Sequence, residues 1–531
     1  MMRERGHKRR TVSLCLCGLL TVLAVTACAV GIYLHVEFPN EKLDELLFYL
    51  TNGAENSDAD AFWDAAKVLW LPIVAVTALL LFLLSGFGIR PRTVQVRLRR
   101  GGRERTWQWF PVRHRWIFTV AACLILTGIG LGQVGAFSYL FSRMQESEFF
   151  EEHYANPQTP GRVSATGQKR NLLFIELESM ETSFFSEEHG GLWNYEVLPE
   201  LYDLLSDPDA IFFATDGGTH GTLNAYGSTW TTAALISYTS GIPFKVPVGK
   251  ENSYHAERFL KGAHALGDIL SANGYRNILV SGAETSFGGV AEYFTTHGEY
   301  AIVDVDHPYF IDPHGERLDF SVPDSQTNNW GFSDEATFRL AQQVLAAQTD
   351  SSDEPWHLFV STIDTHFGGY LYSAGNGYRG SVRTHGTQAE NVYATTSRCV
   401  GEFIAWVKTQ PFYENTTVVI VGDHPNMKKG ICGEVTADDR GRYNLILNAT
   451  VSTENTKNRS FTAFDFYPTV LAAMGFEIRG DRLGLGVNLF SKTATLAEQY
   501  GMEQLNAELE RKSDFYIDRI MGRSDYEGLE G

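Results

Sequence analysis

The stretch Thr417-Val418-Val419-Ile420-Val421-Gly422-Asp423-His424 is an apolar run that ends in two side chains of metal-ligand type. Its β-branched residues favour a strand, and an unbroken apolar run is typical of a strand buried on both faces of a parallel sheet. In open α/β sheets, ligands bind beyond the carboxyl ends of the strands. The stretch therefore predicts a buried strand that carries Asp423 and His424 to a ligand-binding rim.

Two other apolar runs end in the same way. The run Leu172-Leu173-Phe174-Ile175 leads to Glu178, and Leu358-Phe359-Val360 leads to Asp364 and His366. If these runs pair as parallel strands, their acidic and histidine ends meet at one edge of the sheet. This convergence predicts a metal-dependent enzyme.

Strand-like and helix-like stretches alternate through the carboxyl-terminal part of the chain. The predicted strands are 171–177, 210–215, 277–281, 300–304, 357–363, 416–421 and 443–448, and the predicted helices include 230–239, 258–273, 334–348 and 390–409. Such alternation predicts an α/β domain with a mostly parallel central sheet covered by helices. We place this domain at 171–490, after a polar linker at 143–170 and before a helical tail at 491–531 that includes a closing helix over 496–520.

Three apolar segments precede the linker, at about 11–33, 68–88 and 116–139. A membrane-spanning helix needs about 20 apolar residues. The first segment follows a basic start and could be a signal peptide, but two further segments of similar length favour a membrane anchor over residues 1–142.

The segments between these spans differ in charge. Arginine and lysine cluster before the first span and between the second and third, whereas aspartate and glutamate cluster between the first and second. Because basic segments stay cytoplasmic, the amino terminus is predicted inside and the large carboxyl-terminal domain outside, as in a multi-pass protein of a bacterial inner membrane. The net charge of −19 argues against nucleic acid as a partner. A disulfide between Cys399 and Cys432 is permitted in that compartment but is not decided by the sequence.

A candidate nucleophile lies in the stretch 227–235, where a polar turn runs into a helical pattern. Hydroxyl residues at a helix start are often N-caps. At that position, however, free N–H groups and the helix dipole also favour an alkoxide or a phosphate. Thr231 is therefore a candidate for either role.

The predicted metal ligands are Glu178, Asp423 and His424, with Thr231 as a fourth, reactive ligand. Carboxylates with one imidazole suit Mn²⁺, Mg²⁺ or Zn²⁺. A bound ion would lower the pKa of the threonine hydroxyl and neutralise charge on a phosphoryl oxygen. Each residue also has a plain structural interpretation, as a capping carboxylate or a solvated turn. Glu176 is the second choice to Glu178, which lies nearer the end of its strand.

These motifs, in this order, resemble the alkaline phosphatase and sulfatase superfamily, and within it the membrane-bound phosphoglycerol transferases that modify periplasmic glucans or make lipoteichoic acid. The stretches that carry the resemblance are 171–179, Trp230-Thr231-Thr232-Ala233-Ala234, Ser240-Gly241-Ile242-Pro243, Asn329-Trp330-Gly331-Phe332-Ser333-Asp334, Ile363-Asp364-Thr365-His366 and Gly422-Asp423-His424. Together they extend the resemblance over about residues 40–490.

The resemblance implies a mechanism. Thr231 would attack phosphatidylglycerol and form a phosphoglyceryl-threonine, which a hydroxyl of a glycan or a polyol-phosphate acceptor would then displace. It also implies one divalent ion, first of all Mn²⁺, and substrate contacts from Trp330, Asp364 and His366. The family's basic residue after the third strand is missing from 282–287. Phosphoethanolamine transfer, phosphodiester hydrolysis and a non-catalytic sensor or scaffold therefore remain alternatives, whereas the C/S-x-P/A-x-R motif of true sulfatases does not occur.

Overall fold

The computed structural model describes residues 2–38, 43–51, 59–85, 94–96, 105–107, 114–246, 259–328, 330–366, 387–427, 435–436 and 439–522. The chain forms two compact units. The first contains residues 1–43 and 57–141, and the second contains residues 44–56 and 142–531.

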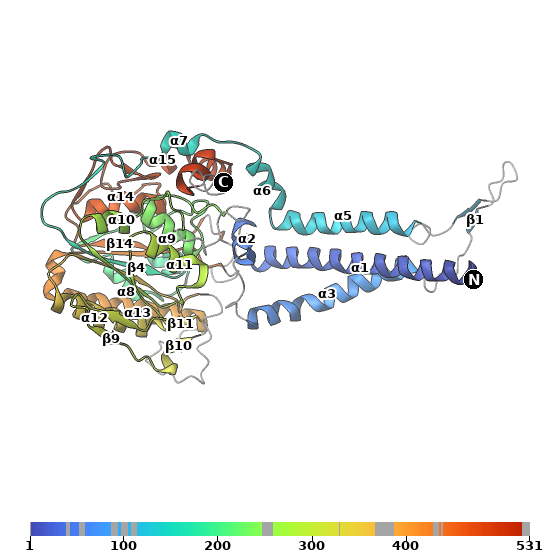
Figure 1. Cartoon of the computed structure of the whole chain (residues 1–531), viewed down its shortest axis with the longest axis horizontal. Helices are drawn as coiled ribbons and strands as arrows, with labels where there is room; N and C mark the ends of the chain where they lie inside the picture. The colour runs from blue at the N-terminus through green and yellow to red at the C-terminus, as the bar shows by residue number, and fades with distance from the viewer. Residues whose placement is uncertain are drawn as a thin grey trace, which may run out of the picture. The chain divides into compact units, whose positions relative to one another are not determined.

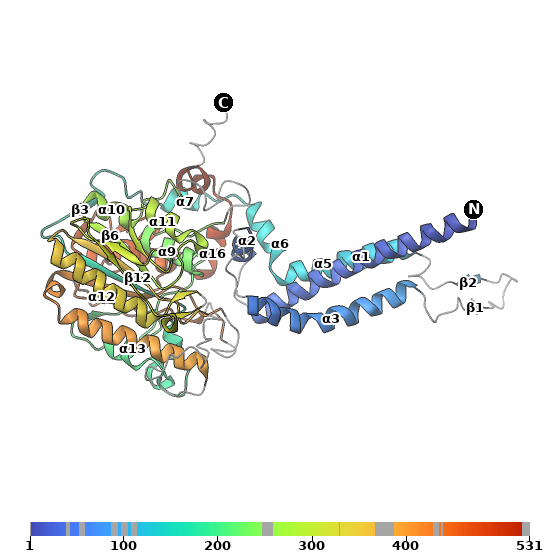
Figure 2. The same ribbon diagram turned by 60° about the horizontal axis from the view of Figure 1, so that its bottom comes forward.

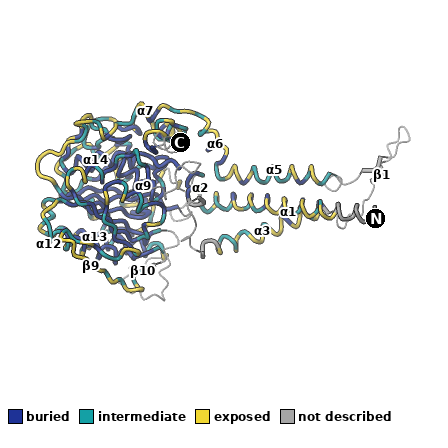
Figure 3. The backbone as a smooth tube through the Cα atoms, in the orientation of Figure 1, coloured by how far each residue is buried: buried dark blue, intermediate teal, exposed yellow. Residues whose placement is uncertain are grey.

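The first unit contains three helices that are long and apolar enough to cross a membrane (Figure 1). They are α1 (Met2–Glu37), α3 (Ala59–Ser85) and α5 (Arg115–Gln133). Many of their large apolar side chains are exposed (Figure 3), as side chains that face lipid must be. The third span ends at Gln133, before the predicted limit at residue 139, because the chain turns at Gly135 (φ 70°) and restarts as α6 (Ala136–Arg143).

A seven-stranded sheet forms the centre of the second unit. Its strand order is β5 (Ala210–Ile211), β14 (Asn444–Leu447), β13 (Thr416–Gly422), β4 (Asn171–Leu177), β12 (Trp356–Ser361), β6 (Arg276–Ser281) and β7 (Ala301–Val303). The strands from β13 to β7 run parallel, and β14 is antiparallel to β13. This is the mostly parallel α/β sheet that the sequence predicts.

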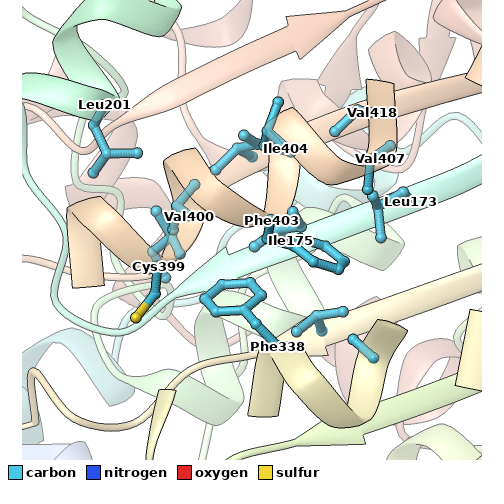
Figure 4. Close-up of a cluster of buried hydrophobic side chains, with 14 of the residues drawn as sticks. Leu173, Ile175, Leu201, Phe338, Cys399, Val400, Phe403, Ile404, Val407 and Val418 are labelled. Carbon is cyan, nitrogen blue, oxygen red and sulfur yellow. The ribbon is translucent and has the colours of Figure 1, made fainter. Parts of the chain in front are cut away.

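Helices cover both faces of this sheet (Figures 1 and 2). On one face, Leu173 and Ile175 of β4 belong to a buried cluster with side chains of α8 (Pro199–Leu204), α12 (Asp334–Ser351) and α13 (Gln388–Lys408) (Figure 4). On the other face, Phe174 stacks on Phe359 at 4.8 Å between ring centroids. There the sheet packs against α9 (Thr231–Ser240), α11 (Val290–Thr296) and α14 (Ala463–Ala473). Burial on both faces explains why these strands read as continuous apolar runs.

Several predicted elements differ in extent; the helix predicted over 258–273, for example, is α10 (Leu266–Ala272) among the described residues. The closing helix predicted over 496–520 is three pieces, α15 (Leu496–Tyr500), α16 (Met502–Glu510) and a single turn at Tyr516–Ile520. Gly501, with a positive φ of 74°, separates the first two, and the extended backbone at Arg511 ends α16. The segment predicted as a linker contains α7 (Phe149–His153) and β3 (Val163–Ala165), which pairs with β15 (Phe476–Ile478). Cys399 is buried in α13, and Cys432 lies outside the described residues.

Candidate metal centre and its pocket

Strand register places the predicted ligands at one edge of the sheet. Strands β13 and β4 are parallel with Gly422 opposite Leu177, so Asp423 and Glu178 leave the sheet side by side. A Cβ atom at Gly422 would fall 1.8 Å from the carbonyl oxygen of Met180, so only glycine allows this approach. The next residue after Glu178, Ser179, holds a left-handed backbone conformation (φ 50°), which is strain of the kind that gathers at functional sites.

Glu178, Asp423 and His424 form a group that could hold a metal ion. Each offers one ligand atom, and these atoms lie within 4.8 Å of one another. All three side chains are at most 1% exposed. The structure thus brings together the three side chains that the sequence predicts as metal ligands.

The protonation of His424 makes this group a receptor for a cation. Its Nδ1 lies 2.9 Å from the carbonyl oxygen of Pro425, which can only accept, so Nδ1 carries a proton and, in the neutral ring, Nε2 presents a lone pair. That lone pair faces Asp423 Oδ2 at 3.2 Å and Glu178 Oε1 at 3.4 Å. Among the described residues, Asp423 Oδ2 is buried without a hydrogen-bond partner. Three inward-facing lone pairs repel one another unless a cation lies between them, so these residues fit a divalent metal ion.

The charges around the group support the same conclusion. Burial, followed by the neighbouring Glu178 carboxylate, raises the pKa of Asp423 to about 7. Burial and then Asp423 also raise the pKa of Glu176 well above its usual value, although Ser361 donates a hydrogen bond to it. Burial disfavours the charged imidazole of His424, but Asp423 and Glu178 outweigh it and raise the pKa. Carboxylates this close and this buried need a positive charge to remain ionised together.

Thr231 lies at the amino end of α9 and faces the same group. Its Oγ1 is 3.2 Å from Glu178 Oε2 and 3.4 Å from His424 Nε2. The N-cap residue, Trp230, makes no side-chain capping bond. The first N–H groups of this helix and its dipole therefore favour an anion beside the Thr231 hydroxyl.

A cavity of about 60 Å³ opens beside Thr231. His366 and Trp330 lie on its wall, with their rings 4.5 Å apart. The turn at Glu284 forms another part of the wall, where the Glu284 N–H donates to the Trp330 carbonyl at 3.0 Å. Two of the three predicted substrate contacts, His366 and Trp330, therefore share one pocket with Thr231.

The third predicted substrate contact, Asp364, lies elsewhere. It is 1% exposed, does not line this pocket, and accepts a hydrogen bond from the Asp334 N–H at 2.8 Å. The Asp334 carboxylate in turn accepts from the N–H groups of Ile363 and Asp364, at 2.9 and 3.1 Å. This reciprocal pair holds the loop that carries His366, and a direct substrate contact from Asp364 stays a prediction.

Some residues around the site are not among those that the sequence singles out. Thr362 Oγ1 accepts from the Glu178 N–H at 2.9 Å, and Thr365 Oγ1 donates to the Glu178 carbonyl at 2.5 Å. The threonines stand between Ser361 and His366, so the motif itself signals them. Phe48, which also lines the pocket, comes from a helix between the first two spans; the resemblance reaches the stretch 47–52 but assigns Phe48 no role at the site.

Comparison with known proteins gives a family match and curated relatives. The model of the sulfatase family matches residues 170–476. The relatives include phosphoglycerol transferase I of Xanthomonas euvesicatoria pv. vesicatoria (strain 85-10), 26% identical over 344 residues, which are 64% of this chain and 45% of that protein. Phosphoglycerol transferase I of Citrobacter koseri is 26% identical over 425 residues, 76% of this chain and 52% of that protein. The chain spans about half the length of the curated relatives it matches.

Solved structures are also similar. The lipoteichoic acid synthase LtaP from Listeria monocytogenes has a TM-score of 0.46 and 16% identity, over 65% of this chain and 81% of that one. The lipooligosaccharide phosphoethanolamine transferase EptA from Neisseria meningitidis has a TM-score of 0.48 and 13% identity, over 94% of this chain and 88% of that one.

Proposed function

Because this chain belongs to the sulfatase family, we propose that it is a membrane-bound transferase that moves phosphoglycerol from phosphatidylglycerol to a hydroxyl group of an envelope glycan or glycerophosphate polymer. The observation that carries the proposal is the position of the Thr231 hydroxyl, between Glu178 and His424 and on the wall of a small pocket. The names of the curated relatives support phosphoglycerol as the transferred group.

The residues that would hold a metal ion are Glu178, Asp423 and His424, with Thr231 beside them. Their carboxylates and single imidazole suit Mn²⁺, Mg²⁺ or Zn²⁺, and the resemblance to the phosphoglycerol transferases puts Mn²⁺ first. When bound, a divalent ion supplies Lewis-acid stabilisation of the phosphoryl oxygens and favours the ionised form of the hydroxyl.

The reaction then has two displacements. Thr231 Oγ1 attacks the phosphorus atom, the bond between phosphorus and the diacylglycerol oxygen breaks, and a phosphoglyceryl-threonine remains. An acceptor hydroxyl next attacks the same phosphorus atom and breaks its bond to Oγ1, which returns Thr231 to its original form. In the first step Thr231 loses one proton, and the oxygen of the departing diacylglycerol gains one. His366, whose imidazole lies on the pocket wall, is the residue proposed to move this proton.

The lining of the pocket also suits phosphoethanolamine as the transferred group. The described residues that line it include Glu284 and no lysine or arginine. A carboxylate accepts hydrogen bonds equally from the hydroxyls of glycerol and from an ammonium group, and it attracts the ammonium in addition. The donor head-group therefore has to be tested directly.

We place the catalytic domain on the outer side of a bacterial inner membrane. The support is the charge asymmetry of the anchor, in which basic segments precede the first span and follow the second. The donor is a phospholipid, so a membrane anchor keeps the enzyme at the surface that contains its substrate.

The test uses the full-length protein in vesicles with phosphatidylglycerol or phosphatidylethanolamine, each labelled in its head-group. We expect label from phosphatidylglycerol to stay on wild-type protein but not on Thr231→Ala, and to move to an added polyol acceptor. Label from phosphatidylethanolamine alone would overturn the phosphoglycerol assignment, and free glycerol phosphate as the only product would indicate a phosphodiesterase. Protein that retains no label and turns over neither lipid would contradict the proposed function as a whole.

A further inference from the structure

One helix that contacts the pocket lies outside the part of the chain matched by the sulfatase family. Helix α2 (Leu43–Thr51) follows the first candidate span in the sequence, and its residues from Asp44 onward belong to the same compact unit as the catalytic sheet. The family match begins only at residue 170. Phe48 of α2 is 1% exposed, so this unit buries it almost completely.

The Phe48 ring packs against the start of the nucleophile helix. It lies 6.0 Å from the ring of Trp230, the residue directly before Thr231, and 5.6 Å from the ring of Phe244, which it meets edge-on. Trp230 and Phe244 also contact each other, at 6.0 Å. The three rings form an aromatic cluster that supports the turn carrying Thr231.

The same ring reaches the opposite wall of the pocket. A Cβ atom at Gly288 would lie 3.9 Å from Phe48 Cζ and only 2.7 Å from Thr232 Oγ1, and Thr232 donates a hydrogen bond to the Gly288 carbonyl at 3.0 Å. Glycine at 288 therefore lets the turn after β6 close on the start of α9, with the Phe48 ring beside both. Phe48 thus contacts two elements that carry pocket residues.

The amino end of α2 is buried within this unit. Asp44 is 1% exposed and acts on Lys245, which is itself buried and donates to the carbonyl of Arg511. Burial lowers the pKa of Lys245, with Arg143 acting in the same direction, whereas Asp44 opposes this shift. The Asp44 carboxylate offsets part of the cost of burying the Lys245 ammonium, and both of its oxygens are themselves buried without a hydrogen-bond partner among the described residues.

We propose that Phe48 is a specificity-determining residue whose ring limits the size of the donor's head-group alcohol beside Thr231. Phe48 lines the same cavity as Thr231 and His366, so its ring takes up space beside the Thr231 hydroxyl that a larger head-group alcohol would need. Helix α2 is thereby part of donor recognition, although it lies in the loop between two membrane spans. This inference rests on the proposed function, because it takes the pocket as the site of the head-group.

The experiment compares donors of different head-group size in the full-length protein. Phosphatidylglycerol is the small donor and phosphatidylinositol the large one, and the measured quantity is the ratio of their kcat/KM values. In Phe48→Ala we expect the ratio to shift at least about tenfold toward phosphatidylinositol, because pocket volume equal to one or two methylene groups already changes selectivity by that factor. Phe48→Leu should shift it less, and Phe48→Trp should lower the use of both lipids.

A matched variant separates specificity from stability. Phe338 is also a buried phenylalanine of this unit, but it packs in the cluster on α12 and α13, away from the pocket lining. Phe338→Leu should lower thermal stability and leave the donor ratio unchanged. If Phe48→Ala does not fold, Phe48→Leu and Phe48→Trp carry the comparison. An unchanged ratio in variants that still take label on Thr231 would overturn the inference and leave the proposed function intact.

Discussion

The hydroxyl oxygen of Thr231 lies 3.2 Å from a carboxylate oxygen of Glu178, which joins the first turn of α9 to the end of β4. An N-cap threonine would instead direct its oxygen to the N–H groups of its own helix. The observed direction makes Thr231 available to an incoming phosphorus atom. We expect Thr231→Ala to lower transfer by at least about 10³-fold while the protein still binds its metal ion.

Thr231→Ser is the control for this substitution, because it keeps the hydroxyl and removes only a methyl group. We expect it to retain measurable covalent labelling by phosphatidylglycerol, and mass spectrometry of the labelled peptide gives the site. Equal turnover by wild type and Thr231→Ala would eliminate this residue as the nucleophile.

Metal binding should depend on Asp423, whose Oδ2 is buried without a hydrogen-bond partner among the described residues. Loss of a residue that merely supports a ligand costs about 10- to 100-fold in metal affinity, so Asp423→Asn should cost at least that much. The measurement is metal content by mass spectrometry after dialysis, followed by titration with Mn²⁺, Zn²⁺ and Mg²⁺. Asp319→Asn, at a side chain that is 70% exposed, is the control. Full metal content in Asp423→Asn would remove Asp423 from the ligand set.

The loop that carries His366 should depend on Asp334, whose carboxylate accepts the N–H groups of Ile363 and Asp364. Asp334→Ala removes Oδ1, the one oxygen that accepts both bonds, and leaves the two N–H groups without it. We expect a loss of about 1–3 kcal/mol in the free energy of unfolding and a higher KM for the donor, with metal content unchanged. Urea unfolding and donor kinetics give the two quantities, and a lost metal ion with an unchanged KM would contradict this role.

Several parts of the site could be predicted from the sequence because parallel strands bring their carboxyl ends to the same edge of a sheet. Once the runs before Glu178 and Asp423 are recognised as parallel neighbours, their ends must meet at one edge. Thr231 is harder, since a helix start reaches that edge only through the packing of α9 against the sheet. The resemblance includes the stretch 47–52, but the place of Phe48 in the pocket was not predicted, because sequence alone does not show that this short helix packs against residues nearly 200 positions away.

The same limits apply to the fold. The strands were predictable from continuous apolar runs, which burial on both faces requires. The prediction of one helix over 496–520 did not take account of Gly501, whose positive φ of 74° separates α15 from α16. Asp364, a predicted substrate contact, accepts a hydrogen bond from the backbone of Asp334, and its contact with substrate stays a prediction. Residue type and rim position alone do not reveal which way a side chain points.

Membrane topology gives a further prediction. If the amino terminus and the arginine-rich segment between the second and third spans are cytoplasmic, the domain after α5 lies outside. A phosphatase reporter fused after residue 490 should then be active, and one fused at residue 100 should be inactive. A cytosolic fluorescent reporter should give the opposite pattern, and activity of the phosphatase only at residue 100 would reverse the proposed orientation.

The acid stability of the protein should depend on His357, a fully buried residue of β12 whose Nδ1 lies 3.1 Å from the Tyr300 hydroxyl. Burial lowers the pKa of this imidazole from 6.5 to about 3. In the folded state it stays neutral, whereas the unfolded chain binds a proton below about pH 6.5, so stability is lost as the pH falls from about 6.5 toward 3. The loss is about 1.4 kcal/mol per pH unit, or about 2 kcal/mol between pH 6.5 and 5.

His357→Asn keeps an acceptor near the position of Nδ1 but does not titrate. Over this pH range its free energy of unfolding should therefore fall by about 2 kcal/mol less than that of the wild type. Urea unfolding at pH 7, 6 and 5 measures the difference, with His314→Asn, at an exposed histidine, as the control. Parallel pH curves for wild type and His357→Asn would show that His357 is not the residue that makes the fold sensitive to acid.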